Sequence, residues 1–110
     1  MAKYERHMSV GISTLLNVIH DGILNGSASA SYEDGSDFNI DGVRCAVRVY
    51  ERYSMMGKNR VSLSVTLLGD ETQTMVSAIT AGGSQAVFFK MNTFGEESFL
   101  ECLESILDQY

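Results

Sequence analysis

The sequence predicts one α+β domain over residues 1–110, a two-layer sandwich in which a five-stranded antiparallel meander sheet carries two helices on one face. Three observations predict this fold. Apolar residues recur at helical spacing near both ends of the chain, they alternate with polar residues in between, and short polar turns separate the alternating stretches. No helical pattern lies between the strands, so we expect the order α-β-β-β-β-β-α and no parallel, doubly wound sheet.

The first helix is predicted over residues 9–25. Ser9 is a candidate N-cap, and the Asn25–Gly26 pair is a stop signal. Gly22 lowers the helix propensity by about 1 kcal/mol relative to alanine. The helix has one apolar stripe, which consists of Ile12, Leu15, Leu16, Ile19 and Ile23.

Five alternating segments follow and are predicted as strands: residues 27–34, 43–53, 60–68, 74–81 and 86–91. The third is the most regular, with apolar residues at 61, 63, 65 and 67 and hydroxyl residues at 62, 64 and 66. Glycine-containing or polar segments separate these strands, which favours short antiparallel connections.

The last helix is predicted to follow Thr93, which stands three residues before Glu96 at the spacing of a capping box. Its apolar stripe consists of Phe99, Leu100, Leu103, Ile106, Leu107 and Tyr110. Both helices have to bury their stripes, and the apolar face of the sheet is the available surface.

The stretch "VRCAVRVYERY", residues 43–53, supplies the candidate binding residues. If Val43, Cys45, Val47 and Val49 face the helices, the alternation of a strand directs the intervening side chains outward. The predicted outer-face binding residues are Arg44, Arg48, Tyr50 and Arg52. Two interpretations remain open: a solvated antiparallel face, or an interaction face rich in the residue types of binding hot spots.

No motif specifies catalysis or metal binding. The segment 37–42, "DFNIDG", matches the start of an EF-hand loop, but Arg48 stands where the bidentate glutamate is needed, so a β-connection is the better interpretation. Residues 80–86, "TAGGSQA", lack the Lys-Ser/Thr of a phosphate loop and are typical of a hairpin. Cys45 and Cys102 are expected to be reduced and mostly buried. We therefore expect no catalytic residue, metal site or cofactor.

Charge and hydropathy exclude further classes. The net charge of −6 argues against nucleic acid as a partner, although residues 44–60 are locally basic and the last fifteen residues are acidic. No apolar run approaches the ~20 residues of a membrane helix. The first ten residues have no apolar core or small-residue cleavage site, so we expect a cytoplasmic protein that does not associate with membranes.

The stretches "VRCAVRVYERYSMMGKNRVSLSVTLLG" and "SAITAGGSQAVFFKMNTFGEESF" resemble a small bacterial family of single-domain proteins that is known only as a domain of unknown function. The similarity extends over nearly the whole chain. It implies a compact cytoplasmic protein of about this length, and it supplies no activity, ligand or catalytic residue.

Two functions are expected from these observations. The first is a non-enzymatic interaction or oligomerisation module, a homodimer that uses the outer sheet face or an exposed strand edge. The alternative is a small-ligand-binding domain with a cavity between sheet and helix, lined by Tyr32, Phe88, Phe89 and methionines.

Overall fold

A computed structural model of the chain describes residues 1–54, 59–82 and 89–110, with the side chains of residues 94–110 in the last segment. The elements in chain order are β1 (Ala2–Met8), α1 (Ile12–Gly26), β2 (Ser31–Ile40), β3 (Val43–Ser54), β4 (Asn59–Gly69), β5 (Thr74–Gly82) and α2 (Phe89–Leu107). The strands form one five-stranded sheet in the order β1-β5-β4-β3-β2, and every neighbouring pair is antiparallel.

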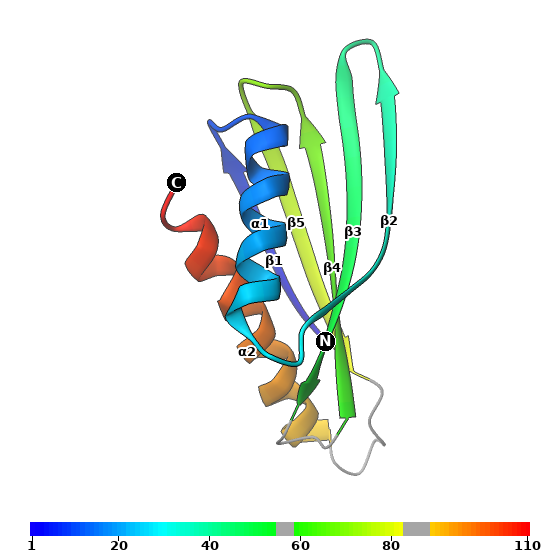
Figure 1. Cartoon of the computed structure of the whole chain (residues 1–110), viewed down its shortest axis with the longest axis vertical. Helices are drawn as coiled ribbons and strands as arrows, with labels where there is room; N and C mark the ends of the chain where they lie inside the picture. The colour runs from blue at the N-terminus through cyan, green and yellow to red at the C-terminus, as the bar shows by residue number, and fades with distance from the viewer. Residues whose placement is uncertain (55–58, 83–88) are drawn as a thin grey trace.

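Both helices lie on the same face of the sheet, so the molecule has two layers and the other face of the sheet is open (Figure 1). The predicted fold class is therefore confirmed. Strands β2 to β5 form the expected meander. The molecule is elongated, with principal extents of 46, 25 and 21 Å.

The element order is β-α-β-β-β-β-α, which corrects the prediction at both ends. Strand β1 precedes the first helix and pairs with β5. The sequence did not predict this strand, because charged residues at positions 3, 5 and 6 interrupt the alternation of apolar and polar residues. The predicted strand at 86–91 is wrong for Phe89–Met91, which begin α2, and residues 86–88 lie outside the described segments. A short apolar run cannot be assigned to strand or helix by periodicity alone.

Two predicted helix starts are also wrong. Helix α1 begins at Ile12 with Gly11 as its N-cap, so Ser9 lies before the helix. Helix α2 begins four residues before Thr93, and the capping-box spacing therefore falls inside the helix. Local sequence signals place helix ends only to within one or two residues, and assignments of the ends differ by as much.

The aspartate-rich segment 37–42 forms the end of β2 and a tight hairpin turn. This agrees with the prediction that the segment is a β-connection and not an EF-hand loop. Asp41 and Gly42 occupy the turn with φ angles of 53° and 80°. Positive φ at both central residues is typical of a type I′ turn, which suits the twist of two paired strands.

The core lies between the helices and the covered face of the sheet. Strand β4 contributes its odd-numbered residues as predicted, and β5 contributes Thr74, Val76, Ala78 and Thr80. The core side chains of the helices and of β4 are Ile12, Leu15, Ile19, Ile23, Phe99, Leu100, Leu103, Leu107, Val61, Leu63, Val65 and Leu67.

Strand β3 is inverted relative to the prediction. Ala46 and Tyr50 are fully buried beneath the helices, and Tyr50 and Arg48 pair with the core residues Leu63 and Val65 of β4. Cross-strand partners share a face of the sheet, so the even-numbered side chains of β3 face the helices. The outward placement of Arg44, Arg48, Tyr50 and Arg52 was therefore wrong. A change of one residue in the phase of a strand exchanges its two faces.

Gly22 explains the close contact between the two helices. A Cβ atom at this position would lie 2.5 Å from Cδ1 and 2.8 Å from Cγ1 of Ile106 in α2. The glycine thus gives up helix propensity in α1 in exchange for close packing against α2.

We expect Gly22→Ala to destabilise the protein by about 1–3 kcal/mol, because the added methyl group overpacks the contact with Ile106. In an Ile106→Ala background the same substitution should instead stabilise by up to about 1 kcal/mol, the gain in helix propensity. Urea unfolding of the four proteins measures this double-mutant cycle. Equal effects of Gly22→Ala in both backgrounds would contradict the packing explanation.

Candidate functional site

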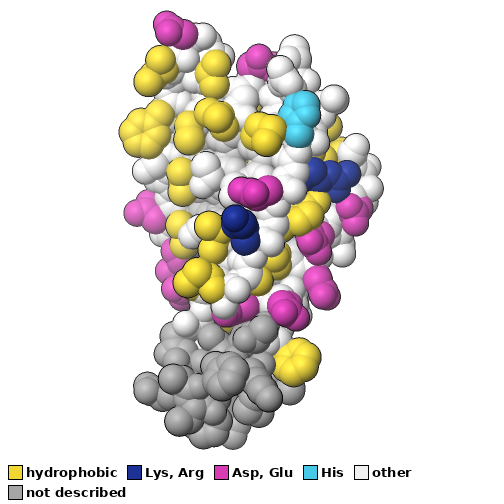
Figure 2. Space-filling model, turned by 180° about the vertical axis from the view of Figure 1, so that it is seen from behind, with side chains coloured by type: hydrophobic (Ala, Val, Ile, Leu, Met, Phe, Trp, Pro, Cys, Tyr) yellow, Lys and Arg dark blue, Asp and Glu magenta, His cyan; other side chains and the backbone are white. Residues whose placement is uncertain are grey.

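The open face of the sheet carries large apolar side chains that are exposed to solvent. The exposed fractions are 74% for Ile40, 61% for Phe38, 50% for Met75 and 48% for Leu68. In Figure 2, which looks onto this face, hydrophobic side chains gather over the upper half of the sheet. Large exposed apolar side chains of this kind are unusual on the surface of a monomeric protein.

The register arranges the open face in rows that run across the five strands. We name two rows after their β4 residue. The Leu68 row consists of His7, Met75, Leu68, Cys45 and Phe38. The Ser64 row consists of Lys3, Ile79, Ser64, Val49 and Asp34. Between them lies a row with smaller side chains: Glu5, Ser77, Thr66, Val47 and Ser36.

Charged groups on this face lie toward its margins. Lys3 and Glu5 belong to the edge strand β1, and Asp34 belongs to the opposite edge strand β2. Nearer the lower end, Arg60 Nε donates to Glu51 Oε1 at 2.9 Å across β3 and β4. The face thus has large apolar side chains at the end around the Leu68 row and polar or charged side chains over the rest.

On the covered face, two of the candidate arginines form a cluster with one acid. Arg44 Nη2 donates to Asp37 Oδ1 at 2.8 Å, and Arg48 Nη2 lies 3.2 Å from both carboxylate oxygens. These hydrogen bonds lower the pKa of Asp37, so its carboxylate remains charged at neutral pH. Arg48 Nη1 also donates to the Val47 carbonyl at 2.8 Å, which fixes the guanidinium against the sheet.

Tyr50 and His20 connect β3 to α1. The Tyr50 hydroxyl lies 3.0 Å from His20 Nδ1, and Tyr32 of β2 packs against both rings, with centroids 5.4 and 5.6 Å away. Burial raises the pKa of Tyr50 to about 12, so the hydroxyl stays protonated. Its hydrogen-bonding partner among the described residues is His20 Nδ1, and the imidazole tautomer sets which of the two atoms donates.

A cavity of about 380 Å³ lies between α1 and β3 beside this pair. We call it the α1–β3 cleft, and its lining consists of Ser13, Leu16, Asn17, His20, Arg44 and Arg48. The sequence-based expectation placed a cavity at Tyr32, Phe88 and Phe89. Phe88 lies outside the described residues and Phe89 begins α2, whereas the cleft lies against the other helix and is mostly polar.

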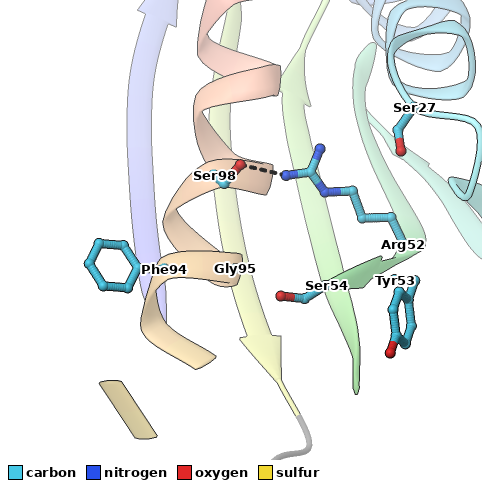
Figure 3. Close-up of a pocket in the computed structure, with 7 residues that line it drawn as sticks. All are labelled: Ser27, Arg52, Tyr53, Ser54, Phe94, Gly95 and Ser98. Carbon is cyan, nitrogen blue, oxygen red and sulfur yellow. Dashed lines mark hydrogen bonds between the residues drawn. The ribbon is translucent and has the colours of Figure 1, made fainter. Parts of the chain in front are cut away.

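Arg52 has a different environment from the other two arginines. Its Nη2 donates to Ser98 Oγ of α2 at 2.8 Å (Figure 3). Its guanidinium carbon lies 4.7 Å from the centre of the Phe99 ring. The hydrogen bond and the cation–π contact attach the lower end of β3 to α2. A shallow cavity of about 260 Å³ beside it is also lined by Tyr53, Ser54 and Phe94. We assign Arg52 a structural role.

The four candidate residues are therefore not one site. Arg44 and Arg48 line the α1–β3 cleft, Tyr50 is buried at its inner end, and Arg52 lies against α2. Sequence reasoning missed His20 and Asp37 as their partners. The helical spacing of Ser13, Asn17 and His20 was the one available signal, because these residues share a helix face.

Within the described segments, no group of three or more histidine, cysteine or acidic side chains is arranged to hold a metal ion. Both cysteines are unpaired and half-buried. In the part of the chain that the structure describes, neither helix combines the length and hydropathy required to cross a bilayer.

The raised pKa of Tyr50 predicts a specific dependence of stability on pH. Because the folded-state pKa of about 12 exceeds the unfolded value near 10, the stabilisation is present below pH 10 and is lost between about pH 10 and 12. The unfolding free energy should fall by up to about 1.4 kcal/mol per pH unit in that window from this group. Tyr50→Phe should abolish this component and cost about 1 kcal/mol at pH 7.

Urea unfolding between pH 8 and pH 11.5 measures the difference between the two proteins. Tyr53→Phe is the matched control, because Tyr53 is 41% exposed and should leave the slope unchanged. Identical alkaline slopes for the parent and Tyr50→Phe would show that Tyr50 titrates as in the unfolded chain.

Comparisons with known proteins give one match. Neither a curated protein nor a solved structure matches the chain. A family model described as a family of unknown function (DUF6054) matches residues 1–110, the whole sequence. The resemblance seen in the two quoted stretches is thus confirmed, and the chain belongs to the DUF6054 family.

Proposed function

We propose that this protein is a non-enzymatic interaction module that forms a homodimer through the open face of its sheet. The observation that carries the proposal is the row of exposed apolar side chains across the sheet, centred on Leu68. Leaving such a surface in water costs free energy that association recovers. The two unpaired cysteines support a reducing, cytoplasmic location for this dimer.

The pattern of the rows favours a second copy of the chain as the partner. In a face-to-face pair with its twofold axis along the strands, each row meets the same row of the other copy, and β1 crosses β2. Leu68 then meets Leu68, and Met75 meets Cys45. An axis across the strands would instead place the Leu68 row over Glu51 and Ser62, which leaves a charge against apolar side chains.

Charge supports the same arrangement. Lys3 and Asp34 occupy opposite edges of the Ser64 row, so the proposed axis brings the lysine of one copy to the aspartate of the other. The pair forms twice in a symmetric dimer. Rim charges of this kind select the partner and its orientation more than they add affinity.

The size of the face is sufficient for a stable dimer. Five strands about 4.8 Å apart and four rows about 6.8 Å apart give a face of about 650 Å² per copy. Two copies would bury about 1,300 Å² in total, which lies within the range of about 1,200–2,000 Å² for specific interfaces.

Leu68→Asp tests the face directly. Because Leu68 lies at the proposed axis and is 48% exposed, the substitution should place two carboxylates at the interface centre while the monomer stays folded. Light scattering after size exclusion should show a dimer for the parent protein at about 50 µM and a weakening of the dimer by at least about 100-fold in the variant.

The matched control is Tyr110→Asp, which also replaces an exposed apolar side chain with a charge but lies beyond α2. It should leave the dimer unchanged. A parent protein that remains monomeric at hundreds of micromolar would refute the proposed function, as would equal effects of the two substitutions.

A charge exchange tests the orientation of the axis. Lys3→Glu should weaken the dimer, because it places a glutamate against Asp34 of the second copy, and Asp34→Lys should weaken it for the opposite reason. The double variant should restore most of the affinity, with a coupling of about 0.5–2 kcal/mol per dimer.

Glu101→Lys, an exposed change on α2, controls for the altered net charge and should have no effect. Dissociation constants from analytical ultracentrifugation give the coupling. If Leu68→Asp breaks the dimer but Lys3 and Asp34 show no coupling, the open face is still the interface and the proposed axis is wrong.

A further inference from the structure

We propose that the α1–β3 cleft binds the phosphate group of a small phosphomonoester. The cleft lies on the helix-covered side of the sheet, so the proposal is independent of the dimer at the open face. Its carrying observation is that side chains with N–H groups that lack a partner among the described residues line one cavity of about 380 Å³. That volume is within the range of small-molecule sites and exceeds what a bare phosphate ion needs.

The two arginines are partly buried and come from one face of one strand. Exposed side-chain fractions are 30% for Arg44 and 19% for Arg48. Placing two guanidinium groups four residues apart in partly buried positions on the helix-covered side of the sheet costs desolvation free energy, and one carboxylate, Asp37, compensates only one of the two charges. The cluster therefore keeps a net positive charge that an anion would balance.

Several donors of the lining have no partner in the described structure. Arg44 uses only Nη2, for Asp37, which leaves Nε and Nη1 available. The side-chain amide of Asn17, an exposed residue of the lining, makes no hydrogen bond to the described residues. A guanidinium with two free N–H groups and a nearby amide match the oxygens of a phosphate.

His20 can add a further donor to the cleft. In the tautomer in which Nδ1 accepts from the Tyr50 hydroxyl, the neutral imidazole carries its proton on Nε2. A protonated imidazole also has a proton on Nε2. In either state the free ring nitrogen is an N–H donor, and only its charge differs.

The acidic groups around the cleft are already engaged or lie outside its lining. Asp37 accepts from both arginines, and Glu71 Oε2 accepts from Ser13 Oγ at 2.7 Å. Asp21 follows His20 on α1 but is exposed and does not line the cavity. A dianionic phosphate thus meets mainly donors. Asp37 sets the affinity, because its charge opposes that of the ligand.

Isothermal titration of the full chain with inorganic phosphate and with glycerol 3-phosphate tests the site, at an ionic strength held constant with chloride. We expect the ester to bind more tightly than phosphate, because the cavity has room for its organic part. Arg44→Gln should weaken binding of both by about 10–100-fold, the effect of losing charge-assisted hydrogen bonds.

Asp37→Asn distinguishes this site from a general surface effect. The substitution removes the carboxylate that pairs with both arginines and should increase the affinity for phosphate several-fold. Arg60→Gln is the control, because it removes an arginine that is paired with Glu51 on the open face. It should leave the affinity unchanged. Circular dichroism and urea unfolding establish that each variant is folded.

The proposal would be overturned if neither phosphate compound bound more tightly than chloride, or if Arg44→Gln left the phosphate affinity unchanged. It would also be overturned if Arg44→Gln and Arg60→Gln lowered that affinity equally, or if malonate bound more tightly than both phosphate compounds. The last result would assign the cleft to carboxylates. The same titration on Leu68→Asp distinguishes the phosphate site from the proposed dimer, because the monomeric variant should still bind phosphate.

Discussion

The burial of Tyr50 is the constraint on which the rest of the structure depends. Its side chain is fully buried between α1 and the sheet, and its hydroxyl reaches His20. A strand alternates its faces, so placing this residue in the core fixes the phase of all twelve residues of β3. Ala46 then lies in the core as well, and the arginines lie on the same side as the helices.

The same phase exposes the other half of the strand. Val43, Cys45, Val47 and Val49 lie on the open face, next to Leu68 and Met75 from the neighbouring strands. An isolated domain would gain from the reverse arrangement, with valines inside and arginines in water. The arrangement becomes favourable when both faces of the sheet are covered, one by the helices and one by another surface.

The charged side chains of β3 can lie on the helix-covered face because the helices do not cover the whole of that face. Strand β2 and the upper part of β3 extend beyond the helices (Figure 1), and the side chains of Arg44 and Arg48 remain 30% and 19% exposed. Their long side chains bury methylene groups and keep their charges near Asp37 and solvent. Arg52 is accommodated by a different means, the face of the Phe99 ring.

Local periodicity predicts the fold class, α1, the core of β4 and the part of the α2 stripe from Phe99 to Leu107. Tyr110, predicted in the same stripe, lies beyond the helix and is 55% exposed. Only the tertiary structure decided which face of β3 is buried, since both of its faces contain residues that can be buried. It also decided that residues 2–8 form a strand, through pairing with β5, and that Phe89–Met91 join a helix. Asp37 of β2 bonds Arg48 of β3, and His20 of α1 lines the same cleft as Arg48; no local pattern in the sequence encodes these neighbours.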